Sequence, residues 1–108
     1  MSFRVKVATP DKTYYEGDAD TLVGPGLGGY FGVLTHHAPM LSAMGTGVLR
    51  VEAAGASHLF VMDGGAAEVT GTAVMILAGQ LEEVRDIAEA EQRLAELMAE
   101  LAEMPRAY

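Results

Sequence analysis

The chain has 108 residues, enough for one domain of typical size, and half of them are hydrophobic. It contains no cysteine, which excludes a disulfide scaffold and a Cys-ligated zinc site. Its formal net charge of −8 opposes binding to a nucleic-acid backbone or to anionic lipid.

The first eighty residues predict short strands separated by turn signals. Residues 2–9 alternate between apolar and polar side chains, as in a half-buried strand. Turns are expected at 10–12, 55–57 and 63–65, where proline or glycine occurs. Strands at this spacing indicate an antiparallel sandwich or barrel. The further strands are expected at 13–16, 21–23, 30–34, 48–53, 58–62, 66–69 and 73–77.

After Gly79 the pattern becomes helical. Apolar residues recur every seven positions in two series offset by three, which predicts one stripe along a helix of about five turns. We therefore divide the chain into a β domain at 1–80 and an acidic helix at 81–108. The stripe consists of Ile87, Ala90, Leu94, Leu97, Leu101 and Met104.

The ends of this helix carry recognisable signals. Asp86 is expected to cap the N-terminus, with Glu89 reaching back in a capping box. Glu89 and Arg93 have the spacing of an i,i+4 ion pair, and Pro105 is expected to end the helix. An isolated helix of this length is marginal in water, so its stripe should pack on its own sandwich, on a partner subunit or on a second copy.

Two motifs could suggest ligand chemistry. Residues 24–29 satisfy the pattern G-x-G-x-x-G, but the residues that follow predict a strand where a dinucleotide site needs a helix, so we interpret them as a flexible loop. His36 and His37 are adjacent, and neighbouring side chains on an extended segment point in opposite directions. With the distant His58 they are better explained as structural or interface residues than as metal ligands.

Five short segments in a fixed order carry a family resemblance. They read GV at 32–33, HAPML at 37–41, GVLRV at 47–51, GGAAEV at 64–69 and VMILA at 74–78. In this order, and followed by an acidic helix, they resemble the epsilon subunit of F-type ATP synthases, in a short form with a truncated helical part. The resemblance covers residues 3–104.

The resemblance implies a β-sandwich of about ten strands followed by a helix. It implies a non-catalytic subunit of the central stalk that couples rotation of the c-ring to ATP synthesis. The implied partners are the gamma subunit, the c-ring and, by extension, the catalytic alpha and beta subunits. The implied place is the cytoplasmic face of the cell membrane, as a peripheral part of the complex, with no cofactor and no metal.

The resemblance also assigns residues to the two main contacts. The family's c-ring contact falls on Gly28, Gly29, Tyr30 and Phe31, where the family often has an acidic residue and this chain is more apolar. The family's gamma contact falls on His37, Pro39 and Met40.

Two departures from the family limit what is carried over. Members often have two C-terminal helices that inhibit ATP hydrolysis, whereas this sequence shows one, so coupling is expected without that inhibition. Some members bind ATP through an Ile/Leu-Asp-x-x-Arg-Ala motif, and the corresponding residues 87–92 lack both the Asp and the Arg. We therefore expect no regulatory ATP site.

Two other classes of function compete with the stalk subunit. A free-standing ligand-binding sandwich, for a sugar for example, is disfavoured because the chain has no Trp and few aromatic residues. A cupin-like metalloenzyme would require His36 or His37 to converge with His58 and a carboxylate.

Overall fold

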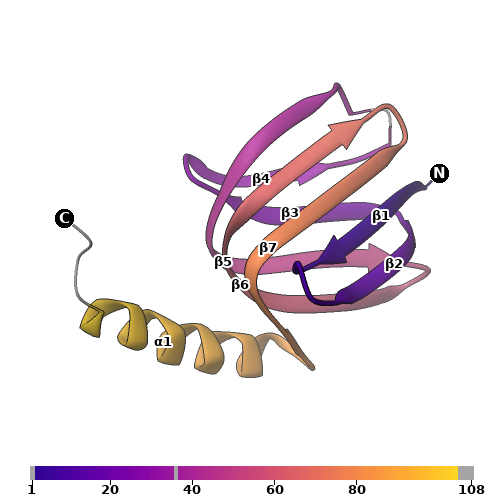
Figure 1. Ribbon diagram of the computed structural model, residues 1–108. Coiled ribbons are helices and arrows are strands. Elements are labelled where there is room, and N and C mark those ends of the chain that lie inside the picture. Colours follow the sequence, from indigo (N-terminus) through magenta and orange to yellow (C-terminus); the bar gives the residue numbers. More distant parts are fainter. Residues whose placement is uncertain (1, 36, 105–108) are drawn as a thin grey trace.

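The computed structural model describes residues 2–35 and 37–104, and in these residues it has seven strands followed by one helix (Figure 1). The predicted class, a mostly β sandwich with a C-terminal helix, is confirmed, but the expected number of about ten strands is wrong. His36 and Pro105, to which the sequence assigned roles, lie outside the described residues. The elements are β1 (Phe3–Ala8), β2 (Thr13–Ala19), β3 (Thr21–Gly26), β4 (Gly29–Val33), β5 (Met40–Ala53), β6 (Ala56–Thr70), β7 (Ala73–Val84) and α1 (Ile87–Glu103).

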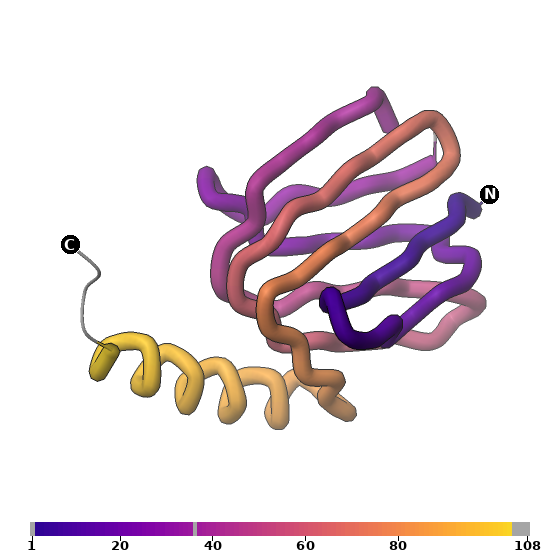
Figure 2. The backbone as a smooth tube through the Cα atoms, in the orientation of Figure 1, coloured from indigo at the N-terminus to yellow at the C-terminus, as the bar shows by residue number. Residues whose placement is uncertain are grey.

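The strands form a single sheet in the order β2-β1-β7-β6-β5-β3-β4. The sheet curls so that its two ends approach each other around a common interior (Figures 1 and 2). Neighbouring strands are antiparallel except β1 and β7, which are parallel, so the expectation of a purely antiparallel sheet is wrong at this pair. On one side β1 pairs antiparallel with β2, to which a hairpin joins it, and on the other side it lies beside β7, the last strand, to which no hairpin joins it.

One predicted break is absent, because β6 runs through residues 63–65 and bends there together with β5 and β7. β5, β6 and β7 have 14, 15 and 12 residues, and they pair across one level at which Met44, Gly65 and Ala78 are register partners. At this level Gly64 and Gly65 have positive φ angles of 71° and 135°. The turn expected at 63–65 is therefore a bend within β6, because glycine permits a backbone that other residues avoid.

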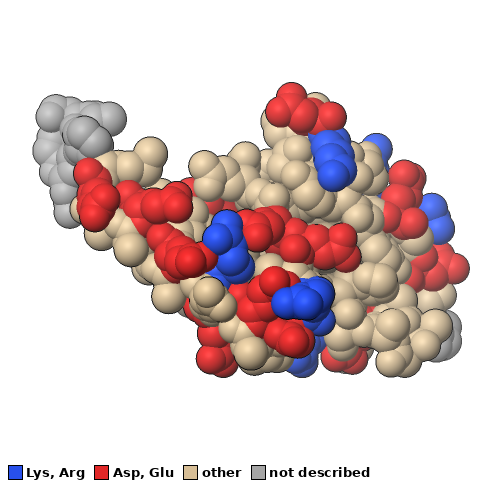
Figure 3. Space-filling view, turned by 90° about the horizontal axis from the view of Figure 1, so that it is seen from below, with Lys and Arg blue, Asp and Glu red and all other residues tan. Residues whose placement is uncertain are grey.

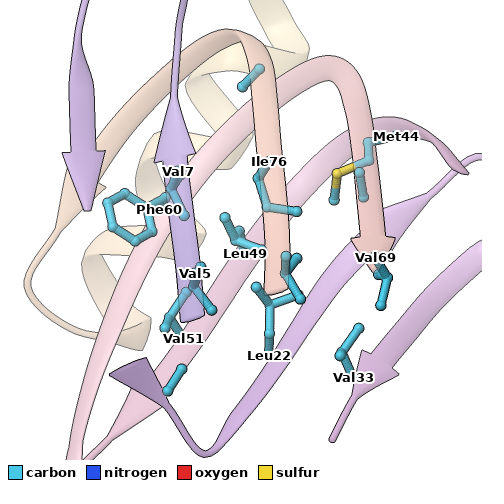
Figure 4. Packing of buried hydrophobic residues seen from close by; sticks show 14 of the residues in the cluster. Val5, Val7, Leu22, Val33, Met44, Leu49, Val51, Phe60, Val69 and Ile76 are labelled. Carbon is cyan, nitrogen blue, oxygen red and sulfur yellow. The ribbon is translucent and has the colours of Figure 1, made fainter. Parts of the chain in front are cut away.

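The bend divides the sheet into two halves whose inner faces meet in the core. We call residues 46–63 with 80–84 the helix-side half, and residues 40–44, 65–70 and 73–78 the far half. Inward side chains of both halves alternate with outward ones, as a pleated strand requires. Figure 4 shows them packed together, and the largest fully buried ones are Phe60, Leu22, Leu49, Met62, Ile76, Val5, Val7, Val33 and Val51.

Gly65 is the position at which the bend tolerates least change. A Cβ atom there would overlap the carbonyl oxygen of Leu77 and lie 2.8 Å from the Cα of Ala78. We expect Gly65→Ala to lower the free energy of unfolding by about 3 kcal/mol, from backbone strain and this clash.

Gly64→Ala is the matched control, because a Cβ there meets no atom within 4 Å and the cost is limited to the left-handed backbone, about 1 kcal/mol. Denaturant unfolding of both variants measures the difference. Equal losses would contradict the steric role assigned to Gly65.

Candidate functional site

The β3–β4 hairpin presents a tight, exposed tip. Gly26 and Gly29 are register partners, so Leu27 and Gly28 form the turn, and Gly29 has a φ of 130°. Leu27 is 74% exposed and Tyr30 is 58% exposed. Phe31 instead packs against the core. Of the four residues that the resemblance selected at this site, Gly28, Gly29 and Tyr30 are at the surface. The sequence pattern did not indicate Leu27, because a single apolar residue between glycines shows neither strand nor helix periodicity.

The loop between β4 and β5 forms a second exposed region. The N–H of His37 donates to the carbonyl of Leu34 at 3.1 Å, which closes a turn. Pro39 is exposed, His37 is half-buried, and Met40 packs against the core. Leu41, the next residue, is 78% exposed. The alternation along 40–44 could have identified Leu41, because a neighbour of an inward Met40 must point outward.

Leu41 belongs to a larger apolar surface on the outer face of the far half. In one row across the sheet, Leu41 pairs with Glu68, and Glu68 pairs with Met75. A parallel row two residues away consists of Ala43, Ala66 and Leu77. Directly paired residues share a face of the sheet, and Leu41, Met75 and Leu77 are all exposed. The patch is mostly apolar, with the exposed Glu68 between Leu41 and Met75, and such a patch is typical of a surface that binds another protein.

Charge is absent from the sequence around both regions. Residues 21–49 contain no Asp, Glu, Lys or Arg, although the chain has 22 such residues. This stretch includes β3, β4, the following loop and the first part of β5. The edge of the sheet that it forms is therefore suited to an uncharged partner surface.

The helix begins with two capping hydrogen bonds. The Asp86 carboxylate accepts from the N–H of Glu89 at 2.8 Å, as expected for an N-cap. The Glu89 carboxylate accepts from the N–H of Arg85 at 2.7 Å, one residue earlier than a capping box requires. The expected box is therefore correct in its first bond and shifted in its second.

The apolar stripe of the helix contacts the sheet only in part. Ala90 is 1% exposed and packs, with Leu94 and Leu97, on the outer face of the helix-side half. Leu101 is half-buried, whereas Ile87 and Met104 are exposed. The C-terminal half of α1 extends beyond the sheet, and acidic side chains line it (Figures 1 and 3). The sheet residues contacted are Val48, Leu59, Val61 and Val84.

Arg93 fastens the helix to β7. Its Nε and Nη2 donate to the two carboxylate oxygens of Glu82 at 2.9 and 2.7 Å, and its Nη1 donates to Glu96. The expected pair of Arg93 with Glu89 is wrong, since Glu89 pairs with Arg85. Hydrogen bonding to Glu82 raises the pKa of Arg93, and the charge of Glu82 and the contacts with Glu96 act in the same direction.

The two motifs with possible ligand chemistry lie apart from any such site. Residues 24–29 are a β hairpin and not the flexible loop that the sequence suggested, and no helix starts after them. His58 lies against Tyr15, with ring centroids 4.8 Å apart, and His37 lies in the loop before β5. Among residues 2–35 and 37–104, no three His, Cys, Asp or Glu side chains are grouped to hold a metal ion. No helix in these residues is long and apolar enough to cross a membrane.

Together these features define a β-sandwich protein whose candidate functional sites are exposed apolar surfaces. The sequence profile of the ATP synthase delta/epsilon chain β-sandwich domain matches residues 2–84. The chain belongs to this family, which confirms the resemblance seen in the sequence.

Individual relatives agree with this membership. The ATP synthase epsilon chain of Leptospira interrogans is 34% identical over 95 residues, which cover 86% of this chain and 75% of the relative. The epsilon chain of Nitratidesulfovibrio vulgaris is 38% identical over 105 residues, covering 89% and 78%.

Solved structures share the fold. A chain of the Euglena gracilis mitochondrial ATP synthase superposes with a TM-score of 0.72 at 21% identity, covering 97% of this chain and 68% of that one. A chain from the central stalk and c-ring of the Tetrahymena thermophila mitochondrial enzyme gives a TM-score of 0.64 at 15% identity, covering 91% of each.

The N-cap makes the start of α1 testable. Asp86→Ala removes the acceptor for the Glu89 N–H, and we expect it to destabilise the helix by about 1 kcal/mol. Amide hydrogen exchange of residues 87–94 measures this local effect. Glu91→Ala, at an exposed position inside the helix, is the control and should leave these amides unchanged. Equal protection in the Asp86 variant and the wild type would contradict the assigned cap.

Proposed function

We propose that this chain is a non-catalytic central-stalk subunit of an F-type, proton-translocating ATP synthase. In this role it couples rotation of the c-ring to ATP synthesis in the catalytic core. The observation that carries the proposal is the uncharged, partly apolar edge at residues 21–49, in a chain of the delta/epsilon family. Such a subunit would work at the cytoplasmic face of the cell membrane, held there through its partners.

The tip of the β3–β4 hairpin is the proposed contact with the c-ring. It comprises Gly28, Gly29, Tyr30 and Phe31, to which the structure adds the exposed Leu27. Phe31 would act from behind, since its ring packs on the core and supports the hairpin. A tight hairpin in the sheet is a firmer support for a rotating contact than a long loop would be.

The proposed contact with the gamma subunit is the loop before β5 together with the outer face of the far half. His37 and Pro39 contribute from the loop, and Met40 anchors it to the core. Leu41, Met75 and Leu77 extend the contact across the sheet. The uncovered C-terminal half of α1 remains available to the catalytic alpha and beta subunits.

The absence of a catalytic role is supported by where the polar groups lie. In the described part of the chain no polar or charged residue is buried, whereas enzymes hold reacting groups in sheltered sites. An open groove of about 500 Å³ lies between α1 and the β1–β2 turn. Glu82 and Arg93 line this groove and are already paired with each other.

The proposal is tested by recovery of the complex. Tagged full-length chain should co-purify the gamma subunit and the c-ring from detergent extracts of its native membranes. Recovery of neither partner would end the proposal, whatever the fold of the isolated chain.

The gamma contact is tested by a charge placed in the apolar surface. Leu41→Asp should weaken binding to the gamma subunit about tenfold or more, because docking would bury an unpaired carboxylate. The residue is so exposed that the isolated chain should keep its stability.

Ser57→Asp is the control, since it places the same charge on an exposed position of β6 near the β5–β6 turn, at the opposite end of that strand pair from Leu41. Titration calorimetry with purified gamma subunit compares the two variants. The same affinity for both would exclude Leu41 from the interface.

A further inference from the structure

The pairing of β3 with β5 is interrupted at Pro25. Val23 pairs with Arg50, but the next recorded pair is Gly26 with Met44, so the register shifts between them. Proline has no N–H and cannot donate to a neighbouring strand. The chain therefore needs another way to hold this part of the hairpin against β5.

The Tyr30 side chain fills this interruption. The N–H of Val48 on β5 donates to the Tyr30 hydroxyl at 2.9 Å. Tyr30 lies on β4, and its register partner on the intervening β3 is Pro25. The Tyr30 hydroxyl thus reaches across β3 at Pro25, the residue of that strand that lacks an N–H. There it accepts from the Val48 N–H the hydrogen bond that a backbone carbonyl would accept in a regular sheet.

Gly47 provides the space for this arrangement. A Cβ atom on Gly47 would overlap the Tyr30 hydroxyl and would lie 2.8 Å from the Cβ of Pro25. Pro25 and Gly47 are both buried, although Tyr30 itself is largely exposed. Pro25, Tyr30 and Gly47 therefore act together, and each residue type is needed at its position.

A second bond secures the tip. The N–H of Leu27 donates to the carbonyl of Ala43 at 3.4 Å, a longer bond than that of Tyr30. The Leu27 side chain lies over Gly45, where a Cβ would be 3.5 Å from Leu27 Cδ2. The hairpin is thus tied to β5 on both sides of its turn, and Leu27 remains 74% exposed.

We infer that Tyr30 is a positioning residue that locks the β3–β4 hairpin to β5, so that Leu27 is the side chain presented to the c-ring. This inference rests on the proposed function. The Tyr30 hydroxyl accepts a hydrogen bond within the subunit, and the tip that would face the c-ring carries no charged side chain. A hairpin held in one position loses little conformational entropy when it binds, and this increases affinity. Without the lock, a strand at the edge of the sheet opens more readily.

The decisive variant is Tyr30→Phe, which removes the hydroxyl and keeps the ring. In the full-length chain we expect the Val48 amide to exchange about fivefold faster, since one hydrogen bond is lost. In the complex with the gamma subunit we expect affinity for detergent-purified c-ring to fall by about the same factor. Tyr15→Phe is the matched control, because the Tyr15 hydroxyl also makes one hydrogen bond to the backbone, which it donates to the carbonyl of Asp18 on β2 at 2.7 Å.

Leu27→Ala separates contact from positioning. It should weaken c-ring binding and leave Val48 exchange unchanged.

The outcomes distinguish the inference from the function beneath it. Unchanged Val48 exchange in Tyr30→Phe overturns the lock, and faster exchange with unchanged c-ring affinity overturns its positioning role. Unchanged c-ring affinity in Leu27→Ala overturns the assignment of Leu27 as the contact. If the wild-type chain with gamma subunit does not bind the c-ring, the proposed function itself fails. The inference is supported if Tyr30→Phe shows faster Val48 exchange and weaker c-ring binding while Tyr15→Phe behaves like the wild type in both measurements.

Discussion

The close approach of β6 to β7 at Gly65 is the constraint on which the fold depends. The backbone of β7 passes so near that no Cβ atom fits, and Gly64 and Gly65 take up a bend that their neighbours across the sheet share. Because β5, β6 and β7 bend at one level, a single sheet can enclose its own core. A straight β6 would leave the inward Phe60 and Val69 with no opposing face against which to pack.

The same bend also gives the two halves separate outer faces, of which the helix covers one. On the helix-side half, outward residues such as Val61 and Leu59 are covered by α1, which Arg93 fastens through Glu82. On the far half, outward Leu41 and Leu77 lie uncovered. The helix is too short, and too firmly attached at its start, to cover the outer faces of both halves. The same three strands, β5, β6 and β7, therefore carry both the contact with α1 and the surface proposed for a partner subunit.

Charged side chains are unevenly distributed over the molecule. Acidic residues gather along α1, whereas the stretch from β3 to the middle of β5 has none (Figure 3). An uncharged edge can be buried in a complex without the cost of desolvating ions. At its tip the hydroxyl of Tyr30 accepts a hydrogen bond from Val48, and the surface left for contact is uncharged.

Several features could be predicted from the order of residues alone: the class of fold, the strand periodicity, the start of the helix at Asp86 and, through ordered short segments, the family. These features depend on neighbours along the chain, where alternation and capping are expressed directly. Other features depend on how distant segments pack: residues 58–62 and 66–69 form one bent strand, β1 runs parallel to β7, and Arg93 pairs with Glu82. The same packing decides that Leu27 and Leu41 face outward while Phe31 and Met40 pack inward. Glycine predicts a turn and a bend equally well in sequence, and pairing between distant strands leaves no local signal, so these outcomes follow only from how the sheet closes on its core.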